Sequence, residues 1–161
     1  MADCFLPEKR SQIMAGIRSG GNLTTEIRFA KILRTYRVAG WRTGSKLPGK
    51  PDFVFSRQKL AIFIDGDFWH GNPKNFRLPK SNVEYWKAKI ARNQIRDGEV
   101  NRALRSLGWG VLRLWESDLR DEEIIIARLQ RRLRNRMVSD NKKAPRMRMI
   151  VALSASKRAS R

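Results

Sequence analysis

The sequence predicts an α/β fold in which helices flank a central mixed β-sheet. Three short runs, residues 51–55, 60–64 and 109–115, are rich in the apolar residues of buried strands. Two further segments, residues 24–36 and 121–134, have the pattern of helices, and a long helical segment lies between the second and third strands. Because the strands and helices are interleaved along the chain, we expect a sandwich of helices around one sheet.

We expect the first helix to begin at Thr24-Thr25, because a Thr side chain can cap a helix and Glu26 places an acid in the first turn. A stripe of apolar residues runs along it at a spacing near 3.6: Ile27, Ala30, Ile32, Leu33 and Tyr36. The turn-rich stretch that follows, residues 40–49, contains a short extended piece at residues 41–43. This segment leads into the strand at residues 51–55.

The strand at residues 60–64 is almost wholly apolar, so we expect it to lie in the interior of the sheet. A tight turn at residues 56–58 precedes it, and a loop with two prolines, residues 72–82, lies beyond its end. The long helix is expected over residues 83–107, and Gly108 should stop it. The side of this helix that we expect to be buried carries Trp86, Ile90, Val100 and Leu104.

The length of 161 residues suits one compact domain with short extensions. We divide the chain into an N-terminal arm (1–22), a folded domain (23–136) and a basic, flexible tail (137–161). With Cys4 as the single cysteine, an internal disulfide and a cysteine-based zinc cluster are excluded. The sequence shows no membrane-spanning run and no signal peptide, so we expect an intracellular protein that does not act at a membrane.

The composition is strongly basic, with 35 Lys and Arg against 15 Asp and Glu and a net charge of +20. Such a charge indicates a polyanionic partner, and nucleic acid is the leading candidate. The tail holds only seven of these basic residues, so the charge does not depend on it. A ribosomal-type RNA-binding protein would be equally basic, so an enzymatic function needs a local constellation of reactive residues.

Such a constellation occurs at the ends of two adjacent strands. Asp52 begins one strand, and Asp65, Asp67 and His70 follow the end of the next. Clustered acids repel one another unless a cation lies between them, and oxygen ligands suit Mg²⁺ or Mn²⁺. Such an ion polarises a phosphodiester, while His70, the only histidine, can exchange a proton with water or the leaving group. Each feature alone also fits a turn, a loop or a structural histidine, but together they favour a nuclease.

A larger set of segments resembles the Vsr-type very-short-patch mismatch repair endonucleases. The segments are Pro51-Asp52-Phe53, residues 63–71, Tyr85-Trp86, Lys89-Ile90, Asn93, Arg96-Asp97, Leu107-Gly108-Trp109 and Trp115-Glu116. The resemblance covers about residues 9–133 and implies a restriction-endonuclease-like fold. It also implies a Mg²⁺-dependent (or Mn²⁺-dependent) nick in one strand of duplex DNA beside a T·G mismatch. We therefore expect a monomer in the bacterial cytoplasm, at the nucleoid when acting, with mismatch-repair proteins as further candidate partners.

The resemblance assigns roles to individual residues of the cleavage site. Asp52 is implied to be the central Mg²⁺ ligand, assisted by the backbone carbonyl of Ile64. His70 is implied to serve the water or the leaving group, and Glu26 to be an accessory acid. Asp65 stands where some members have His, so it is either a second ligand or a hydrogen-bond acceptor.

The resemblance also implies side chains that open and hold the DNA. Phe68 and Trp69 match aromatic residues that enter the duplex beside the mismatch, and Met14 matches a wedge from the N-terminal arm. The alternative for both rings is packing in the protein core. Along the long helix, Lys89 and Asn93 share one face and either contact base edges or lie in solvent. Three other basic residues of that helix are expected to meet phosphates: Lys87, Arg92 and Arg96.

The chain departs from the family at its structural zinc site, which is usually a set of Cys and His ligands. The matching positions are Asp67, Asn72, Lys74 and Ser117. Since none of these is Cys or His, we expect no structural zinc. The departure leaves three functions open: mismatch-directed nicking, nicking without mismatch specificity, and DNA binding without cleavage.

Overall fold

The computed structural model describes residues 23–137. The predicted N-terminal arm with Met14 lies outside the described residues, as does the predicted tail apart from Met137. Four strands form one sheet: β1 (Trp41–Arg42), β2 (Phe53–Phe55), β3 (Leu60–Asp65) and β4 (Gly110–Trp115). The first three strands are antiparallel neighbours and β4 pairs with β3 in parallel, so the sheet is mixed and β3 is interior, as predicted.

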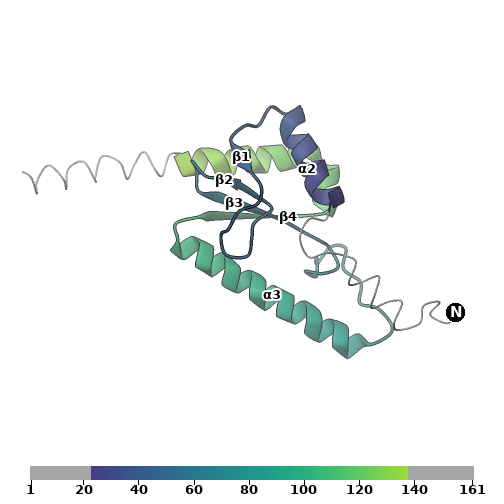
Figure 1. Cartoon of the computed structure of the whole chain (residues 1–161). Coiled ribbons are helices and arrows are strands. Elements are labelled where there is room, and N and C mark those ends of the chain that lie inside the picture. Colours follow the sequence, from purple (N-terminus) through teal and green to yellow (C-terminus); the bar gives the residue numbers. More distant parts are fainter. Residues whose placement is uncertain (1–22, 138–161) are drawn as a thin grey trace, which may run out of the picture.

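Helices cover both faces of this sheet (Figure 1). Helix α3 (Val83–Ser106) lies on one face, and α2 (Leu23–Thr35) lies on the other together with the last helix, residues 122–137. A short 3-10 helix, η1 (Ser117–Arg120), follows β4 and was not predicted. The predicted order of helices and strands is otherwise confirmed, and their bounds differ from the prediction by a few residues.

The two faces of β3 pack into two separate clusters, which explains its almost wholly apolar sequence. Leu60 and Ile62 face the larger cluster, which includes Leu33 of α2. Ala61 and Phe63 face the smaller cluster, on the side of the sheet that α3 covers. Leu104 of α3 is fully buried in this cluster. Side chains alternate between the faces of a strand, so successive residues of β3 serve different helix layers.

The prediction for the apolar stripe of the first helix was wrong at its two ends. Ile27 is 56% exposed and Tyr36 is 37% exposed, whereas Phe29, Ile32 and Leu33 carry the packing. These three residues lie three and four positions apart on one face, and the helix has only that face against the sheet. Thr24 and Thr25 lie inside the first turn, because α2 already begins at Leu23.

Gly108 ends α3 as predicted. It adopts a left-handed backbone conformation (φ 79°), and its N–H donates to the Arg105 carbonyl at 2.9 Å. Trp109 N–H donates to the Leu104 carbonyl, also at 2.9 Å, so the last carbonyls of the helix are satisfied. The chain then turns directly into β4, which is parallel to β3.

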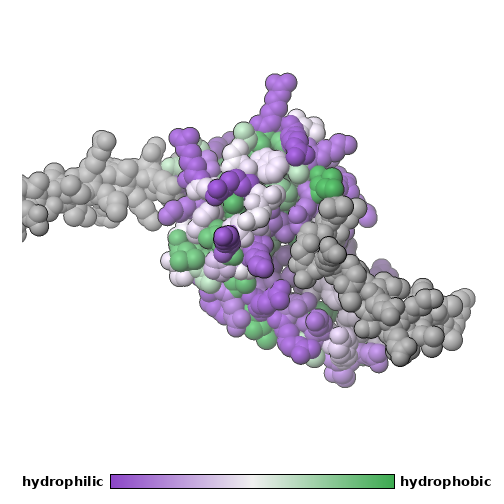
Figure 2. Space-filling model, in the orientation of Figure 1, coloured by the Kyte–Doolittle hydropathy of each residue, from purple (hydrophilic) through white to green (hydrophobic). Residues whose placement is uncertain are grey.

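The exposed face in Figure 2 is mostly hydrophilic, and its apolar residues lie in small separate groups. Scattered exposed apolar side chains are normal on a protein surface. No helix of residues 23–137 is long and apolar enough to span a membrane. The face in view is therefore mostly polar.

Candidate active site

Asp52 lies just before β2 and is tied to the end of β3. Its Oδ2 accepts a hydrogen bond from the backbone N–H of Ile64 at 2.7 Å. Burial raises the pKa of Asp52 from 3.8 to about 6, although the Ile64 hydrogen bond opposes the shift. The charges of Glu26 and Asp65 raise the pKa of Asp52 further. Asp52 and Asp65 therefore lie near each other at the end of the sheet, whereas the Asp67 carboxylate, which was predicted to join them, is bound by Asn72 and Ser117.

Asp65 is the last residue of β3, and its buried carboxylate is paired with an arginine side chain that the sequence did not indicate. Both of its carboxylate oxygens lie 2.9 Å from Nη1 of Arg113, which projects from the neighbouring strand β4. Burial raises the pKa of Asp65, and the charge of Arg113 opposes that rise. Of the two roles left open for Asp65, this geometry supports the hydrogen-bond acceptor.

His70 is held by an acid from the opposite helix. Its Nδ1 lies 2.5 Å from Oδ2 of Asp97 on α3, and 3.8 Å from Oδ1 of Asp65. Asp97 also forms an ion pair with Arg113, with Nη2 and Oδ1 3.0 Å apart. Because Nδ1 is directed at a carboxylate, Nε2 is the ring nitrogen that remains for a substrate.

The backbone of the His70 segment is also fastened to α3. Asn93 Nδ2 donates to the carbonyl of Trp69 at 2.8 Å, and Gln94 Nε2 donates to the carbonyl of His70 at 3.1 Å. Gly71 permits this close approach, since its φ is 66° and a Cβ there would meet Gln94 Nε2 at 2.8 Å. Asn93 was predicted to contact base edges or solvent, and in the structure its amide holds the loop instead.

Asp65, His70, Asp97 and Arg113 line a cavity of about 400 Å³ between the end of the sheet and α3. This volume is at the lower end of the range for small-ligand sites. Its lining combines one imidazole, two carboxylates and one guanidinium, so the cavity offers hydrogen-bond donors and acceptors to a polar group.

An aromatic cluster lies beside this site. Phe68 contacts Trp86 edge-on with ring centroids 5.1 Å apart, and Trp69 lies 6.0 Å from the same ring. Phe76 and Tyr85 complete the cluster. Its members belong to neither buried cluster of the sheet, and Phe68 and Trp69 are half-buried. Both rings therefore pack against other aromatic side chains outside the main core, and their role as wedges in DNA stays a prediction.

Comparison with known proteins decides the family. The family model for DNA mismatch endonuclease Vsr matches residues 2–75. The type II nicking enzyme V.NmeDIP of Neisseria meningitidis serogroup C is 40% identical over 119 residues, which cover 73% of this chain and 80% of the relative. V.XorIIP, a type II nicking enzyme of Xanthomonas oryzae, is 38% identical over 84% of this chain and 96% of its own length. The chain belongs to the Vsr family.

Another Vsr-family relative is the DNA mismatch endonuclease Vsr of Escherichia coli, which is 36% identical over 76% of this chain and 79% of its own length. The Vsr family is restriction-endonuclease-like, and the four-stranded mixed sheet with helices on both faces agrees with that fold. The predicted family and fold class are therefore confirmed.

Two residues of the site, Asp97 and Arg113, were given no role from the sequence. Asp97 lies four positions after Asn93, so the two residues share one face of α3, and both contact the His70 segment in the structure. Arg113 shares its face of β4 with Val111 and Trp115, and these apolar neighbours are the one signal that it faces something other than solvent. Neither pattern indicates the partner, because Asp65 and Arg113 are 48 positions apart.

The remaining basic residues predicted to contact DNA lie along α3. Arg92 and Arg96 are exposed, and Lys89 is half-buried. Lys87 forms an exposed ion pair with Glu84, with Nζ and Oε1 2.9 Å apart. An exposed pair of this kind contributes little to stability, so Lys87 can exchange its partner for a phosphate.

Proposed function

We propose that this Vsr-family chain is a divalent-metal-dependent endonuclease that nicks one strand of duplex DNA at or near T·G mismatches. The observation that carries the proposal is the pairing of His70 with Asp97 next to Asp65, the last residue of the strand whose Ile64 N–H binds the buried carboxylate of Asp52. A carboxylate and a histidine held by a second acid are the groups that phosphodiester hydrolysis needs. The names of the relatives support DNA nicking, and one of them names mismatches.

Asp52 and the carbonyl of Ile64 would hold the Mg²⁺ or Mn²⁺ ion. Residues 23–137 contain no group of three His, Cys, Asp or Glu that could hold a metal. Mg²⁺ commonly binds one or two carboxylates and completes its shell with water and substrate oxygens, so the residues present fit such an ion. When bound, the ion would polarise the phosphodiester and stabilise the leaving oxygen. Glu26 adds negative charge that attracts the cation to Asp52.

The protein groups would divide the remaining tasks. Asp97 fixes the orientation of His70, and Nε2 of His70 takes a proton from water or gives one to the leaving oxygen. Arg113 balances the charges of Asp65 and Asp97, so the imidazole does not face two uncompensated carboxylates. The phosphate would lie in the cavity between these groups.

Mismatch preference would arise from the aromatic cluster. An apolar wedge unstacks a base step at a cost of a few kcal/mol, and the cost is smaller at a weakened pair. Phe68 and Trp69 are half-buried and lie outside the core, so they can reach a duplex held over α3. Met14 stays a candidate second wedge.

One observation favours a second candidate, which is nicking without mismatch specificity. Asn93, which was expected either to contact base edges or to lie in solvent, donates its amide to the Trp69 carbonyl. Fewer free polar groups on α3 would leave less direct readout of the bases.

A strand-specific cleavage assay tests the proposal. Matched and T·G duplexes, labelled separately on each strand, are incubated with the protein in Mg²⁺ or in EDTA. We expect a single-strand cut in the T·G duplex with Mg²⁺ and no cut in EDTA. Equal cutting of both duplexes would support the second candidate. Binding without any cut would show that the chain is a DNA-binding module.

Removing the proposed wedge should reduce mismatch selectivity. We expect the double variant Phe68→Ala, Trp69→Ala to lower the ratio of T·G to matched cutting by about tenfold or more. A tenfold change corresponds to roughly 1.4 kcal/mol, which is part of the few kcal/mol that unstacking a base step costs. The melting temperature should fall less than after Phe53→Ala in the core. Tyr36→Ala on α2 is the control for loss of a partly exposed ring. An unchanged ratio together with a large loss of stability would show that the rings have a structural role only.

The raised pKa of Asp52 predicts opposite pH dependences for cleavage and stability. The carboxyl must be ionised to attract a cation, so at subsaturating Mg²⁺ the cleavage rate should fall as the pH drops through about 6. In EDTA the folded state favours the protonated form. The contribution of Asp52 to the free energy of unfolding is therefore fully present below pH 3.8 and is lost as the pH rises through about 6. Melting temperature against pH in EDTA measures this loss, and a profile identical to that of Asp52→Asn would contradict it.

A further inference from the structure

The positions that match the family's structural zinc site contain a different kind of contact in this chain. They offer a carboxylate (Asp67), an amide (Asn72), an ammonium (Lys74) and a hydroxyl (Ser117). Structural zinc takes thiolate and imidazole ligands, and an ammonium repels a cation. The residues present therefore do not fit zinc.

Three of these residues are joined by hydrogen bonds, and we call Asp67, Asn72 and Ser117 the Asn72 network. Nδ2 of Asn72 donates to Oδ1 of Asp67 and to Oγ of Ser117, the latter at 3.4 Å. Oγ of Ser117 donates to the same Asp67 oxygen at 2.9 Å. Oδ1 of Asn72 accepts from the backbone N–H of Lys74 at 3.0 Å. An amide has two donor hydrogens and one acceptor oxygen, and all of them are used.

The burial of Asn72 shows that the network is an internal part of the structure. Asn72 is 1% exposed, and it is one of three buried polar residues in the described part of the chain. Its backbone is equally engaged, because its N–H donates to the Asp67 carbonyl at 2.8 Å and its carbonyl accepts from Phe76 at 2.7 Å. A polar side chain buried to this degree is strongly destabilising if its partners are removed.

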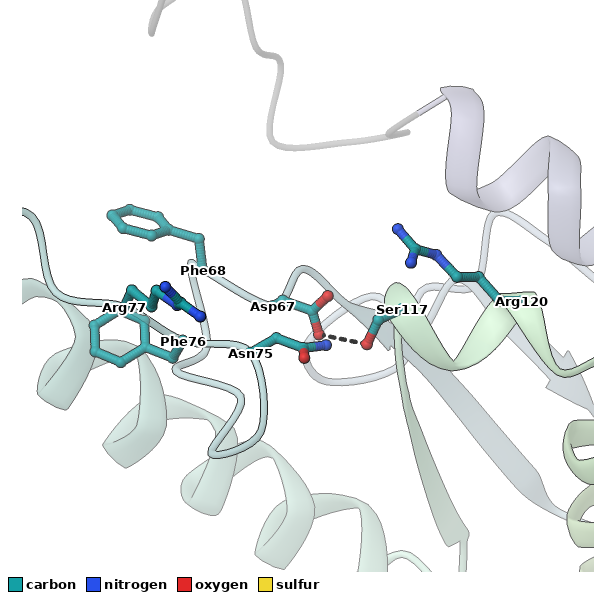
Figure 3. A pocket seen from close by; sticks show the side chains of 7 residues that line it. All are labelled: Asp67, Phe68, Asn75, Phe76, Arg77, Ser117 and Arg120. Atoms are coloured by element: carbon teal, nitrogen blue, oxygen red, sulfur yellow. Dashed lines mark hydrogen bonds between the residues drawn. The ribbon is translucent and has the colours of Figure 1, made fainter.

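The Asn72 network joins two segments that are far apart in the sequence. Asp67 and Asn72 lie in the loop between β3 and α3, and Ser117 opens η1, 45 positions after Asn72. Figure 3 shows the Asp67–Ser117 hydrogen bond, with Phe68 next to Asp67 on the loop and Arg120 on the side of η1. These residues line a cavity of about 330 Å³ together with Phe76.

The aromatic cluster is therefore held from two sides. Helix α3 fastens one side, because Asn93 donates to the Trp69 carbonyl and Trp86 contacts both rings. The Asn72 network fastens the other side, next to Phe68. We infer that the Asn72 network takes the place of a structural metal and sets the position of Phe68 and Trp69 for DNA. The inference rests on the proposed function only because it names DNA as the ligand. The residues of the Asn72 network are positioning residues, since they act through Phe68 and Trp69.

Asn72→Ala in the full chain is the main test. We expect the KM for a T·G duplex to rise about tenfold, as for the loss of a buried hydrogen-bonded group, while kcat changes by less than about threefold. The change in kcat should be small because Asp97 and Gln94 still hold His70. The near-ultraviolet circular dichroism of the free protein should weaken, since Trp69 and Trp86 are in contact. Asn75→Ala is the matched control, because Asn75 is an exposed residue of the same loop whose backbone N–H donates to the Asn72 carbonyl, a bond that the substitution keeps.

Two further variants separate a hydrogen-bond network from a metal site. Asp67→Asn keeps the acceptor oxygen, so its KM and spectrum should stay within about threefold of those of the wild type, whereas loss of a metal ligand would cost at least tenfold. Ser117→Ala leaves Asn72 in place and should give an intermediate KM, which keeps the test informative if Asn72→Ala does not fold.

Three results would overturn the inference. They are a wild-type KM and spectrum in both Asn72→Ala and Ser117→Ala, an effect of Asn75→Ala as large as that of Asn72→Ala, and one tightly bound zinc per chain by elemental analysis. The spectrum and the zinc content require no cleavage. A chain that binds DNA without cutting it would refute the proposed function, and the dissociation constant for DNA would then replace KM.

Discussion

Asp52→Asn should reduce strand cleavage by several orders of magnitude while DNA binding survives. The substitution keeps the shape of the side chain, and its amide oxygen can still accept the hydrogen bond from Ile64. It removes the charge that would hold Mg²⁺ and with it the stabilisation of the leaving oxygen. Single-turnover nicking of a T·G duplex measures the loss, and fluorescence anisotropy measures the binding.

The same substitution should stabilise the protein in EDTA at neutral pH. A pKa raised from 3.8 to about 6 corresponds to at most about 3 kcal/mol of unfavourable charge in the folded state. Mg²⁺ should then raise the melting temperature of the wild type but not that of Asp52→Asn. Asp121→Asn, at an exposed position before the last helix, is the control. Near-normal cutting by Asp52→Asn would refute the assignment of the site.

His70→Ala should lower the cleavage rate by about a hundredfold to ten-thousandfold, which is the usual contribution of a general acid or base. Asp97→Asn should cause a smaller loss, because an amide can donate to Nδ1 and favour the wrong tautomer while the imidazole remains. Both variants should bind DNA nearly normally, since neither substitution removes a Lys or Arg that would pair with the phosphate backbone. Single-turnover rates across pH provide the measurement.

A rescue experiment separates proton transfer from structural damage. Free imidazole should restore part of the activity of His70→Ala but none of that of Asp52→Asn. Gln94→Ala, which removes a hydrogen bond to the His70 backbone, should cost much less than His70→Ala. If His70→Ala cut at the wild-type rate, the pairing with Asp97 would be structural and another group would transfer the proton.

Local patterns in the sequence were sufficient for most of the fold. The apolar run of β3 predicted an interior strand, and the spacing of apolar residues predicted α3 and its end at Gly108. These features depend on neighbours within a few positions, so they can be read along the chain. The positions of Asp52 and His70 at adjacent strand ends were predictable for the same reason.

The stripe of the first helix shows where local patterns stop being sufficient. Ile27 fits the period of an apolar face, but α2 contacts the sheet through Phe29, Ile32 and Leu33 only. Similarly, the pairing of Phe68 with Trp69 fits both a core and a surface cluster. Whether the two rings lie in a core or in a surface cluster depends on how far α3 and η1 lie from the loop, and the residues next to the rings in the sequence do not determine that distance.

The partners of the site residues were decided by tertiary structure. Asp65 meets Arg113 because β3 and β4 are parallel neighbours, and His70 meets Asp97 because α3 packs over the end of the sheet. Asn72 meets Ser117 because η1 follows β4 at the same edge. Composition, periodicity and strand ends were readable in the sequence because they are properties of short segments. Charge pairing across 27 to 48 positions depends on strand register and helix packing, which only the folded chain determines.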